Sequence, residues 1–580
     1  MRRVLIGAAL AALCAPAHAQ CVIDSTGASF TNPTAPECRS QAFTFTENDA
    51  GGSNLALGYP TPQPVESLTG VDGFRSYASL LARHQDLMTV HPHVQGTVVG
   101  TTRAGNAIWA YVLGDADDRK ADGSLEPAVM VNGGIHAREW QSPEAVSETL
   151  EQLAAMAQDG GFWEYLRDSV TQVIVPVLNI DGFLQTQRWP TRVVGSASQP
   201  RDGRMRRKNL RHPSRGTPVD MDLDTTDDNL FGVDLNRNSV HGFGLNNSST
   251  LDTFSLVYRG PAAASEPEIQ ALQAAAALGP DSRLRLYTDV HSFSQIFFTQ
   301  MIGDARRDAI TRELMNRLRA VTDFRYRDGS SAPQPLGVGG IGLTADYFAY
   351  EYRIPSWTLE TEPLSSGAQY GGTGISHSGF VLPDSEVRRM REEVASMLIL
   401  GAYAQAGPPA VAALEFYAGD CAAADADATY AARWETQASG TERTLNVTAN
   451  RALVPGQPYC LWLAFDKPMR VRDDANAVTN YTGQSVALNP GIVLATATEE
   501  LVVPGTDVSW LNQAAPAPGG FLRYADDALA VTVTLPDSWN ITTATPLVVQ
   551  IATDDAASRG LDTNPATAAD WADGHWTGYE

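Results

Sequence analysis

Histidine and acidic side chains at short spacing can bind a metal ion, and one such pair lies in the stretch GGIHAREW, residues 133–140. His136 and Glu139 are three residues apart, and Arg138 lies between them. Alone, this spacing is weak evidence, because a chain with ten histidines meets it by chance and a loop histidine held by ordinary hydrogen bonds explains it as well. A metal site needs further ligands from elsewhere in the chain.

Further polar residues follow other apolar stretches of the chain. His291 comes directly after LRLYTDV, and Glu360 comes directly after SWTL. Zinc in hydrolases binds three histidine or carboxylate ligands and keeps one position for water. His136, Glu139 and His291 supply such a set, and Glu360 could then take a proton from the metal-activated water. The chain contains no H-E-x-x-H motif, which excludes the arrangement that this motif builds on one helix.

Seven motifs in a fixed order resemble the zinc metallocarboxypeptidases of the carboxypeptidase A and B type: HAREW, RMRRK, GVDLNRN, YRGPAAASEPE, HSFSQ, the TLE of SWTLETEP, and GFVLP. The resemblance covers about residues 66–403 and does not extend further. It implies that His136, Glu139 and His291 bind one Zn²⁺ per chain. It also implies that Glu360 is the general base of a peptide hydrolase.

The same resemblance implies roles for five further residues. Arg207 would polarise the scissile carbonyl and stabilise its oxyanion, and Asp234 would orient a zinc-bound histidine. Asn236 and Arg237 would hold the terminal carboxylate of the substrate, and Arg138 would contact the substrate upstream. These roles suit the side chains, because a guanidinium keeps its charge and can donate two parallel hydrogen bonds to a carboxylate.

One position departs from the family pattern. The family has a mobile tyrosine shortly before an aspartate that corresponds here to Asp346, and counting back without gaps places Val338 at the tyrosine position. Tyr347, Tyr350 or Tyr370 could substitute for it, and the sequence does not decide among them. We therefore leave tyrosine out of the predicted site and expect weaker turnover or binding without loss of hydrolysis.

Specificity and the competing functions depend on a few positions. In the family, the pocket for the terminal side chain is set partly by the residues that correspond here to Ala345 and Thr358. Neither is acidic, so the sequence favours a neutral or aromatic terminal residue over a strictly basic one.

The alternative functions are a catalytically impaired peptide-binding protein that keeps the fold and a peptidase that trims cell-wall peptides. Glu360 argues against a pure binder, which needs no base beside a metal.

The elements around these residues predict an α/β domain whose mixed central sheet is covered by helices on both faces. Buried strands are expected at 127–132, 170–178 and 284–290. Gly133 and Gly134 allow a sharp exit from the first strand, and Ser142 with Pro143 starts a helix. His136 and Glu139 therefore fall on a strand-to-helix loop, where ligands of such sheets bind.

Two further helices complete this part of the chain. Ser265 and Glu268 form the S-x-x-E pattern of a capping box, and another helix is expected at roughly 384–403 before the linker AQAGPPA. Beyond it, strand-like runs without helical patterns predict an all-β, sandwich-like domain. The predicted segments are a signal peptide (1–19), an extended leader (20–65), the catalytic domain (66–403), a linker (404–411) and a β-rich accessory domain (412–580).

The N-terminal residues MRRVLIGAALAALCAPAHAQ have the features of a secretory signal cleaved after Ala19, which predicts a secreted or periplasmic protein. The leader is too short for a globular inhibitory prodomain. Four of the five cysteines remain after cleavage, and in an exported chain they suggest two disulfides. Of the three possible pairings, we favour Cys21 with Cys38 and Cys421 with Cys460, because each pair lies within one segment.

The composition limits the class of partner. The net charge of −24 over 580 residues provides no basic face for nucleic acid. The apolar stretch of the signal is too short to span a bilayer, so we expect no transmembrane segment. The predicted partners are peptide or protein C-termini. The sequence does not define the oligomeric state, and we expect a monomer.

Overall fold

The computed structural model describes a part of the chain that contains all the predicted site residues. It describes residues 65–551 except for 72, 116, 118–125, 189–194, 197–198, 202, 220–229, 246, 280–283, 333–339, 372–375, 408–410, 422–431, 440–441, 450–452, 466–469, 472–491, 505–506, 511–524, 527 and 543–547. Nearer the N-terminus it describes the short strands β1 (Val22–Ile23) and β2 (Phe30–Thr31). The signal peptide and the Cys21–Cys38 pair lie outside the described residues.

An eight-stranded mixed sheet forms the centre of the first half of the chain. Its strand order is β11 (Arg327–Asp328), β10 (Ile296–Thr299), β12 (Ser356–Thr361), β9 (Leu284–Ser292), β5 (Ala128–Asn132), β6 (Thr171–Val175), β4 (Ala107–Leu113) and β3 (Val94–Thr101). The middle strands β12, β9, β5 and β6 pair in parallel, and so do β10 and β11. The pairs β10 with β12, β6 with β4 and β4 with β3 are antiparallel. The carboxyl ends of β5, β9 and β12 therefore meet at one edge.

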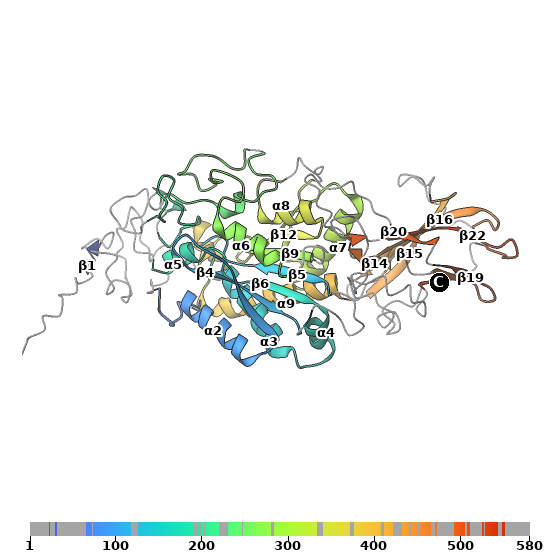
Figure 1. Cartoon of the computed structure of the whole chain (residues 1–580), viewed down its shortest axis with the longest axis horizontal. Coiled ribbons are helices and arrows are strands. Elements are labelled where there is room, and N and C mark those ends of the chain that lie inside the picture. The colour runs from blue at the N-terminus through green and yellow to red at the C-terminus, as the bar shows by residue number, and fades with distance from the viewer. Residues whose placement is uncertain are drawn as a thin grey trace, which may run out of the picture.

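Helices cover both faces of this sheet, as predicted. Helix α6 (Pro267–Ala276) packs on one face, and α2 (Tyr77–Val90), α3 (Gln141–Met156) and α9 (Asp384–Ala406) pack on the other (Figure 1). β5, β6 and β9 are buried along their whole length, which is typical of parallel strands covered on both sides. None of the helices in the described ranges is long and apolar enough to cross a membrane.

The remaining helical elements of this half are shorter or lie at its margins. They are α4 (Gly161–Ser169), α5 (Ile180–Arg188), η3 (Leu235–Arg237), α7 (Ala305–Ala320), α8 (Thr344–Tyr347), η5 (Phe348–Tyr352), η6 (Gly367–Tyr370) and η7 (Ser376–Phe380). One further two-stranded ladder joins β7 (Gly195–Ser196) to β8 (Gln199–Pro200).

The predicted boundaries hold to within a few residues. β6 ends at Val175 because Pro176 has no N–H to donate to the sheet, while β9 runs two residues further than expected and includes His291. Helix α3 begins at Gln141, and the Ser142 hydroxyl donates to the carbonyl of Glu139 instead of capping the helix. Both differences occur where the chain leaves the sheet.

The predicted capping box at Ser265 is wrong. Helix α6 has Pro267 in its first turn, and the residue before it, Glu266, is the N-cap with extended backbone angles. Proline favours the first helical position because its φ is already helical and it needs no N–H acceptor there. The hydroxyl of Ser265 instead donates to the carboxylate of Glu266 at 2.8 Å.

The described residues beyond helix α9 form antiparallel β-sheets, as expected. Helix α9 runs to Ala406, three residues into the expected linker. One sheet has the order β15 (Glu442–Ala449), β14 (Ala432–Ser439), β13 (Val411–Ala418), β16 (Pro458–Phe465), β22 (Ala528–Thr534) and β20 (Ser509–Trp510). A second sheet has the order β19 (Glu500–Val503), β18 (Ile492–Ala495) and β23 (Val548–Ile551). A third, two-stranded sheet pairs β17 (Arg470–Val471) with β21 (Ala525–Asp526). All these pairs are antiparallel.

The two larger C-terminal sheets share one core, which makes the arrangement sandwich-like. Leu461 and Leu463 of β16 and Ile492 and Leu494 of β18 are all fully buried in a cluster separate from the core of the first half. β18 alternates buried and half-buried residues, whereas β16 is buried on both faces, since Cys460 and Trp462 pack in a separate small cluster.

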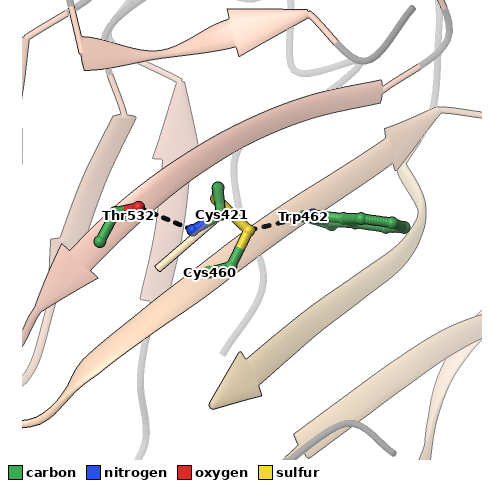
Figure 2. The surroundings of a disulfide bond; sticks show 4 residues. All are labelled: Cys421, Cys460, Trp462 and Thr532. Carbon is green, nitrogen blue, oxygen red and sulfur yellow. Dashed lines mark hydrogen bonds between the residues drawn. A yellow bond between two sulfur atoms is a disulfide. The ribbon is translucent and has the colours of Figure 1, made fainter. Parts of the chain in front are cut away.

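A disulfide between Cys421 and Cys460 lies in the C-terminal sheet, which confirms this predicted pairing (Figure 2). The amide of Cys421 donates to the hydroxyl of Thr532 on β22 at 3.0 Å. The indole N–H of Trp462 donates to the sulfur of Cys460 at 3.1 Å. The bond therefore ties the segment after β13 to β16 in the middle of the sheet.

Candidate active site

The loop between β5 and α3 is rigidly held and buried. The amide of Gly133 donates to the carbonyl of Val175 at 2.9 Å, and Gly134 has a φ of +65°, which favours glycine. A Cβ at Gly133 would lie 2.8 Å from the carbonyl oxygen of Ser142, so both glycines are needed for this exit. Further along, the amide of Ala137 donates to the carbonyl of Arg207 at 3.2 Å.

The three predicted metal ligands converge at the carboxyl edge of the sheet. Suitable donor atoms of His136, Glu139 and His291 all lie within 4.8 Å of one another, and all three residues are buried. Nδ1 of His136 lies 2.9 Å from Oε1 of Glu139, and Nδ1 of His291 lies 2.9 Å from Oε2 of the same carboxylate. The centres of the two imidazole rings are 4.6 Å apart.

The outer nitrogens of both histidines face carboxylates. Nε2 of His136 lies 3.0 Å from Oδ1 of Asp234, and Nε2 of His291 lies 2.8 Å from Oδ2 of Asp289. A histidine whose outer nitrogen is held this way presents the lone pair of its inner nitrogen to a metal. The predicted position of Asp234 behind a ligand histidine agrees with this geometry.

Chemically, this donor set fits zinc. Two imidazole nitrogens and one carboxylate are a ligand set that catalytic zinc sites use. Nδ1 of His291 is buried and makes no hydrogen bond to a described residue, although Glu139 is near it, so a metal would satisfy an otherwise unpaired lone pair.

Glu360 lies next to this cluster because β12 is the parallel neighbour of β9. Glu360 and His291 are direct partners in the register of the two strands. Oε2 of Glu360 is buried and has no hydrogen-bond partner among the described residues. Burial and the nearby carboxylate of Glu139 raise the pKa of Glu360 to about 8, which is close to the range in which a carboxylate exchanges protons at neutral pH.

Arg207 reaches the cluster from the segment RMRRK. Its Nη1 lies 3.2 Å from Nδ1 of His136 and 3.8 Å from Oε1 of Glu139, and 15% of its side chain is exposed. Burial alone would lower the pKa of Arg207, but the carboxylates of Asp234 and Glu139 outweigh burial and raise it above its usual value. The guanidinium is thus a charged donor beside the converging ligands.

Asn236 and Arg237 lie on the short helix η3, which begins at Asp234. The Asp234 side chain accepts a hydrogen bond from the amide of Asn236 at 3.1 Å, and the Asn236 side chain accepts one from the amide of Thr344 at 3.0 Å. Nδ2 of Asn236 lies 3.4 Å from Nε2 of His291, which brings this predicted carboxylate-binding residue to the metal cluster.

The guanidinium of Arg237 has only backbone acceptors in the described parts of the chain. It donates to the carbonyls of Ser248 at 3.0 Å and Asn236 at 2.6 Å, and no described carboxylate is within ion-pair distance of it. Burial lowers the pKa of Arg237, and the more distant Asp234 offsets this only in part. Such a cation is suited to receive an anionic group.

The side chain of Arg138 lies against Phe380. Its guanidinium carbon lies 4.3 Å from the centre of the Phe380 ring, and its carbonyl accepts a hydrogen bond from Arg204 at 3.1 Å. Phe380 belongs to the GFVLP motif, so two motifs far apart in the sequence meet here. This contact is compatible with the predicted substrate role but does not test it.

Each tyrosine proposed as a substitute has other contacts. Tyr350 is buried with its ring stacked on His241 at 4.3 Å, and Tyr370 donates to the carboxylate of Glu362 at 2.5 Å. Tyr347 packs against neighbouring aromatic rings of the core. Val338 lies outside the described residues.

The two predicted specificity positions are both buried. Ala345 is the second residue of the short helix α8 and is fully buried, and the buried hydroxyl of Thr358 on β12 has no hydrogen-bond partner among the described residues. Between them, Asp346 uses Oδ2 to accept hydrogen bonds from the amides of Ile341 and Leu343 at 2.6 and 3.0 Å.

Sequence reasoning missed Asp289, which contacts His291. The signal was present, because Asp289 is the one acidic residue in the apolar strand LRLYTDV and lies two residues before His291. Residues two apart in a strand point to the same face.

Residues 80–397 match the model of a protein family described as zinc carboxypeptidase. Carboxypeptidase B of Homo sapiens is 28% identical over 335 residues, which are 55% of this chain and 68% of that protein. Carboxypeptidase B of Bos taurus is 28% identical over 314 residues, or 52% and 63%, so the chain spans about two thirds of these relatives. The crystal structure of carboxypeptidase A from Helicoverpa armigera aligns with 57% of this chain and 73% of that chain at 21% identity and a TM-score of 0.44.

Proposed function

Since this chain belongs to the zinc carboxypeptidase family, we propose that it hydrolyses the C-terminal peptide bond of peptides or proteins. One zinc ion would be held by His136, Glu139 and His291. The observation that carries this proposal is the convergence of these three buried side chains, with the outer nitrogen of each histidine held by a carboxylate. Such an arrangement is expensive to bury without a cation at its centre.

The reaction would need a base and an oxyanion donor. Bound zinc would lower the pKa of a water molecule to roughly 7 and polarise the scissile carbonyl. Glu360, the strand neighbour of His291, would accept a proton from the attacking water and transfer it to the leaving amine. Arg207 would donate to the developing oxyanion, and one such donor contributes about 3–4 kcal/mol in comparable enzymes.

Substrate binding would use a guanidinium that forms no ion pair with a described carboxylate. Arg237 and Asn236 would receive the terminal carboxylate, since the guanidinium of Arg237 has only carbonyl acceptors among the described residues. Arg138 would contact the substrate upstream of the scissile bond. The absence of an acidic residue at Ala345 and Thr358 supports a neutral or aromatic terminal residue.

The location and the domain division remain part of this proposal. The N-terminal signal pattern supports export to the periplasm or the medium, with cleavage after Ala19. We retain a catalytic domain at 66–403 and a β-rich accessory domain at 412–580, supported by the two separate hydrophobic cores.

One observation favours a second candidate, a catalytically impaired peptide-binding protein. The stretch PQPLGVGGIGLTADY has no tyrosine before Asp346, where the family pattern has one. Against it, Glu360 keeps a buried, unpaired carboxylate oxygen beside His291, which a binder would not need. A peptidase that trims cell-wall peptides would use the same residues and differ only in substrate.

The decisive experiment is C-terminal release from a mixed peptide library, measured with the full mature chain. We expect single residues to be released, activity to be lost with a zinc chelator and restored with zinc, and Glu360→Gln to reduce kcat by about 10³-fold while zinc stays bound. Cell-wall peptides are included as a second substrate set. Peptide binding without release by the zinc-loaded protein would establish the impaired binder instead.

A further inference from the structure

Asp289 is a fully buried carboxylate in the middle of the sheet, and polar side chains from three elements surround it. Oδ1 accepts a hydrogen bond from Nδ2 of Asn132 on β5 at 2.8 Å. Oδ2 accepts one from the hydroxyl of Thr344 on α8 at 2.7 Å and faces Nε2 of His291 at 2.8 Å. Neither the family motifs nor the proposed reaction assigns this residue a role.

The direction of these hydrogen bonds determines the state of His291. A carboxylate can only accept, so Nε2 of His291 must carry the proton and Nδ1 must carry the lone pair that faces Glu139. The amide of Asn132 is oriented as well, because its oxygen accepts a hydrogen bond from the hydroxyl of Tyr287 and its nitrogen therefore points at Asp289.

The same carboxylate is connected to the proposed substrate-binding residue. Thr344 donates through its hydroxyl to Asp289 and through its amide to the side-chain oxygen of Asn236 at 3.0 Å. The backbone amide of Asn236 in turn donates to the carboxylate of Asp234, which also contacts Nε2 of His136. A continuous buried path therefore joins the two histidines through Thr344 and Asn236.

We propose that Asp289 is a positioning residue that fixes the tautomer and the ring orientation of His291, and so sets how tightly the chain holds its metal. Asn132 and Thr344 orient Asp289 for this purpose. The inference rests on the proposed zinc site. Losing a partner of this kind costs about 10- to 100-fold in metal affinity or activity in other metalloproteins.

Asparagine cannot replace Asp289 without a conflict. Three groups donate toward the two oxygens of Asp289, so the NH₂ group of Asp289→Asn would face at least one donor. The exchange Asn132→Asp with Asp289→Asn removes this conflict. The new carboxylate at 132 would accept from the new amide and from Tyr287, while the amide oxygen at 289 would accept from His291 and Thr344.

The test measures the zinc dissociation constant of the full mature chain by competition with a chelator, together with kcat and KM. We expect Asp289→Asn to weaken zinc binding by about 10- to 100-fold, and the double exchange to recover at least half of that loss on a logarithmic scale. Thr344→Val, which removes one donor, should weaken zinc binding by about fivefold and serves if Asp289→Asn does not fold.

Asp181→Asn is the matched control. Asp181 is also buried and accepts hydrogen bonds from a threonine hydroxyl, an asparagine amide and a backbone amide, those of Thr102, Asn106 and Ala104. Its loss should lower stability and leave zinc affinity unchanged.

Two results overturn the inference while the proposed function stands: wild-type zinc affinity in Asp289→Asn, or a double exchange no better than the single one. Failure of the proposed function can also be told apart from failure of this inference. A wild-type chain that binds zinc but releases no residue ends the proposed function, whereas the Asp289 comparison can still be read from zinc affinities. A wild-type chain that binds no zinc overturns both.

Discussion

Arg207 and Asp234 are joined by two hydrogen bonds to a single carboxylate oxygen: Nε and Nη2 of Arg207 lie 3.2 and 3.0 Å from Oδ2 of Asp234. The other oxygen, Oδ1, faces Nε2 of His136 at 3.0 Å. One fully buried carboxylate therefore holds a proposed zinc ligand and a proposed oxyanion donor in fixed relation to each other.

This relation predicts a selective defect for Arg207→Lys. Lysine keeps the charge but cannot make both hydrogen bonds to Asp234, so its ammonium would not be held where the oxyanion forms. We expect kcat to fall by about 10²- to 10³-fold with little change in KM and with zinc content unchanged. Steady-state kinetics with metal analysis measures this. A raised KM at normal kcat would instead assign Arg207 to ground-state binding.

A second prediction concerns the terminal carboxylate of the substrate. Arg237→Gln should raise KM by about 10- to 100-fold for peptides with a free C-terminus, because a charge-assisted hydrogen bond is lost. Peptides with an amidated C-terminus, which lack the charge, should bind the variant and the wild type alike. The control is Arg319→Gln on α7, since Arg319 also donates to a backbone carbonyl, that of Tyr326. An equal effect on both kinds of peptide would contradict the role of Arg237.

A third prediction concerns pH and stability. Burial and the neighbouring carboxylate of Glu266 raise the pKa of Glu268 from 4.5 to about 8, and its buried Oε1 has no hydrogen-bond partner in the described parts of the chain. Between these two values the folded protein binds more protons than the unfolded one, so stability falls as pH rises from about 5 to 8. Glu268→Gln stays neutral and should remove this part of the slope.

Chemical denaturation at pH 5, 6.5 and 8 checks this expectation by comparing the two proteins. The difference in unfolding free energy should grow in favour of Glu268→Gln toward pH 8. Glu266→Gln is the contrast, because Glu266 forms ion pairs with Arg103 and Arg211 and its loss should destabilise the fold. Parallel pH profiles for wild type and Glu268→Gln would show that the carboxyl titrates normally.

A fourth prediction concerns the stability of the C-terminal sheets, whose core is separate from that of the first half. Replacing Cys421 and Cys460 with alanine opens a loop of 39 residues and should lower the stability of the C-terminal sheets by about 2–4 kcal/mol. The proposed site residues belong to the other half, so kcat/KM on short peptides should not change. Calorimetry and peptide hydrolysis on the same sample measure both quantities. A matching loss of activity would mean that the β-rich part supports the site.

Local patterns in the sequence were enough to predict the sheet, the helices on its faces and the loop that carries His136 and Glu139. Apolar strands, a glycine exit and an ordered set of motifs are each readable over a few residues. Where two local signals competed, the reading failed, as at Ser265, because Pro267 determined where helix α6 begins.

The contacts around Asp289 were decided by the tertiary structure alone. Its partners Asn132 and Thr344 are 157 and 55 residues away, and they meet only because β5 and β9 pair in parallel and α8 packs against β9. Hydrogen bonds over such separations leave no spacing pattern in a single chain. The sequence by itself determined which residues could bind a metal and put Asp289 two residues before His291, whereas the packing of β5 and α8 beside β9 decided which side chains orient that carboxylate.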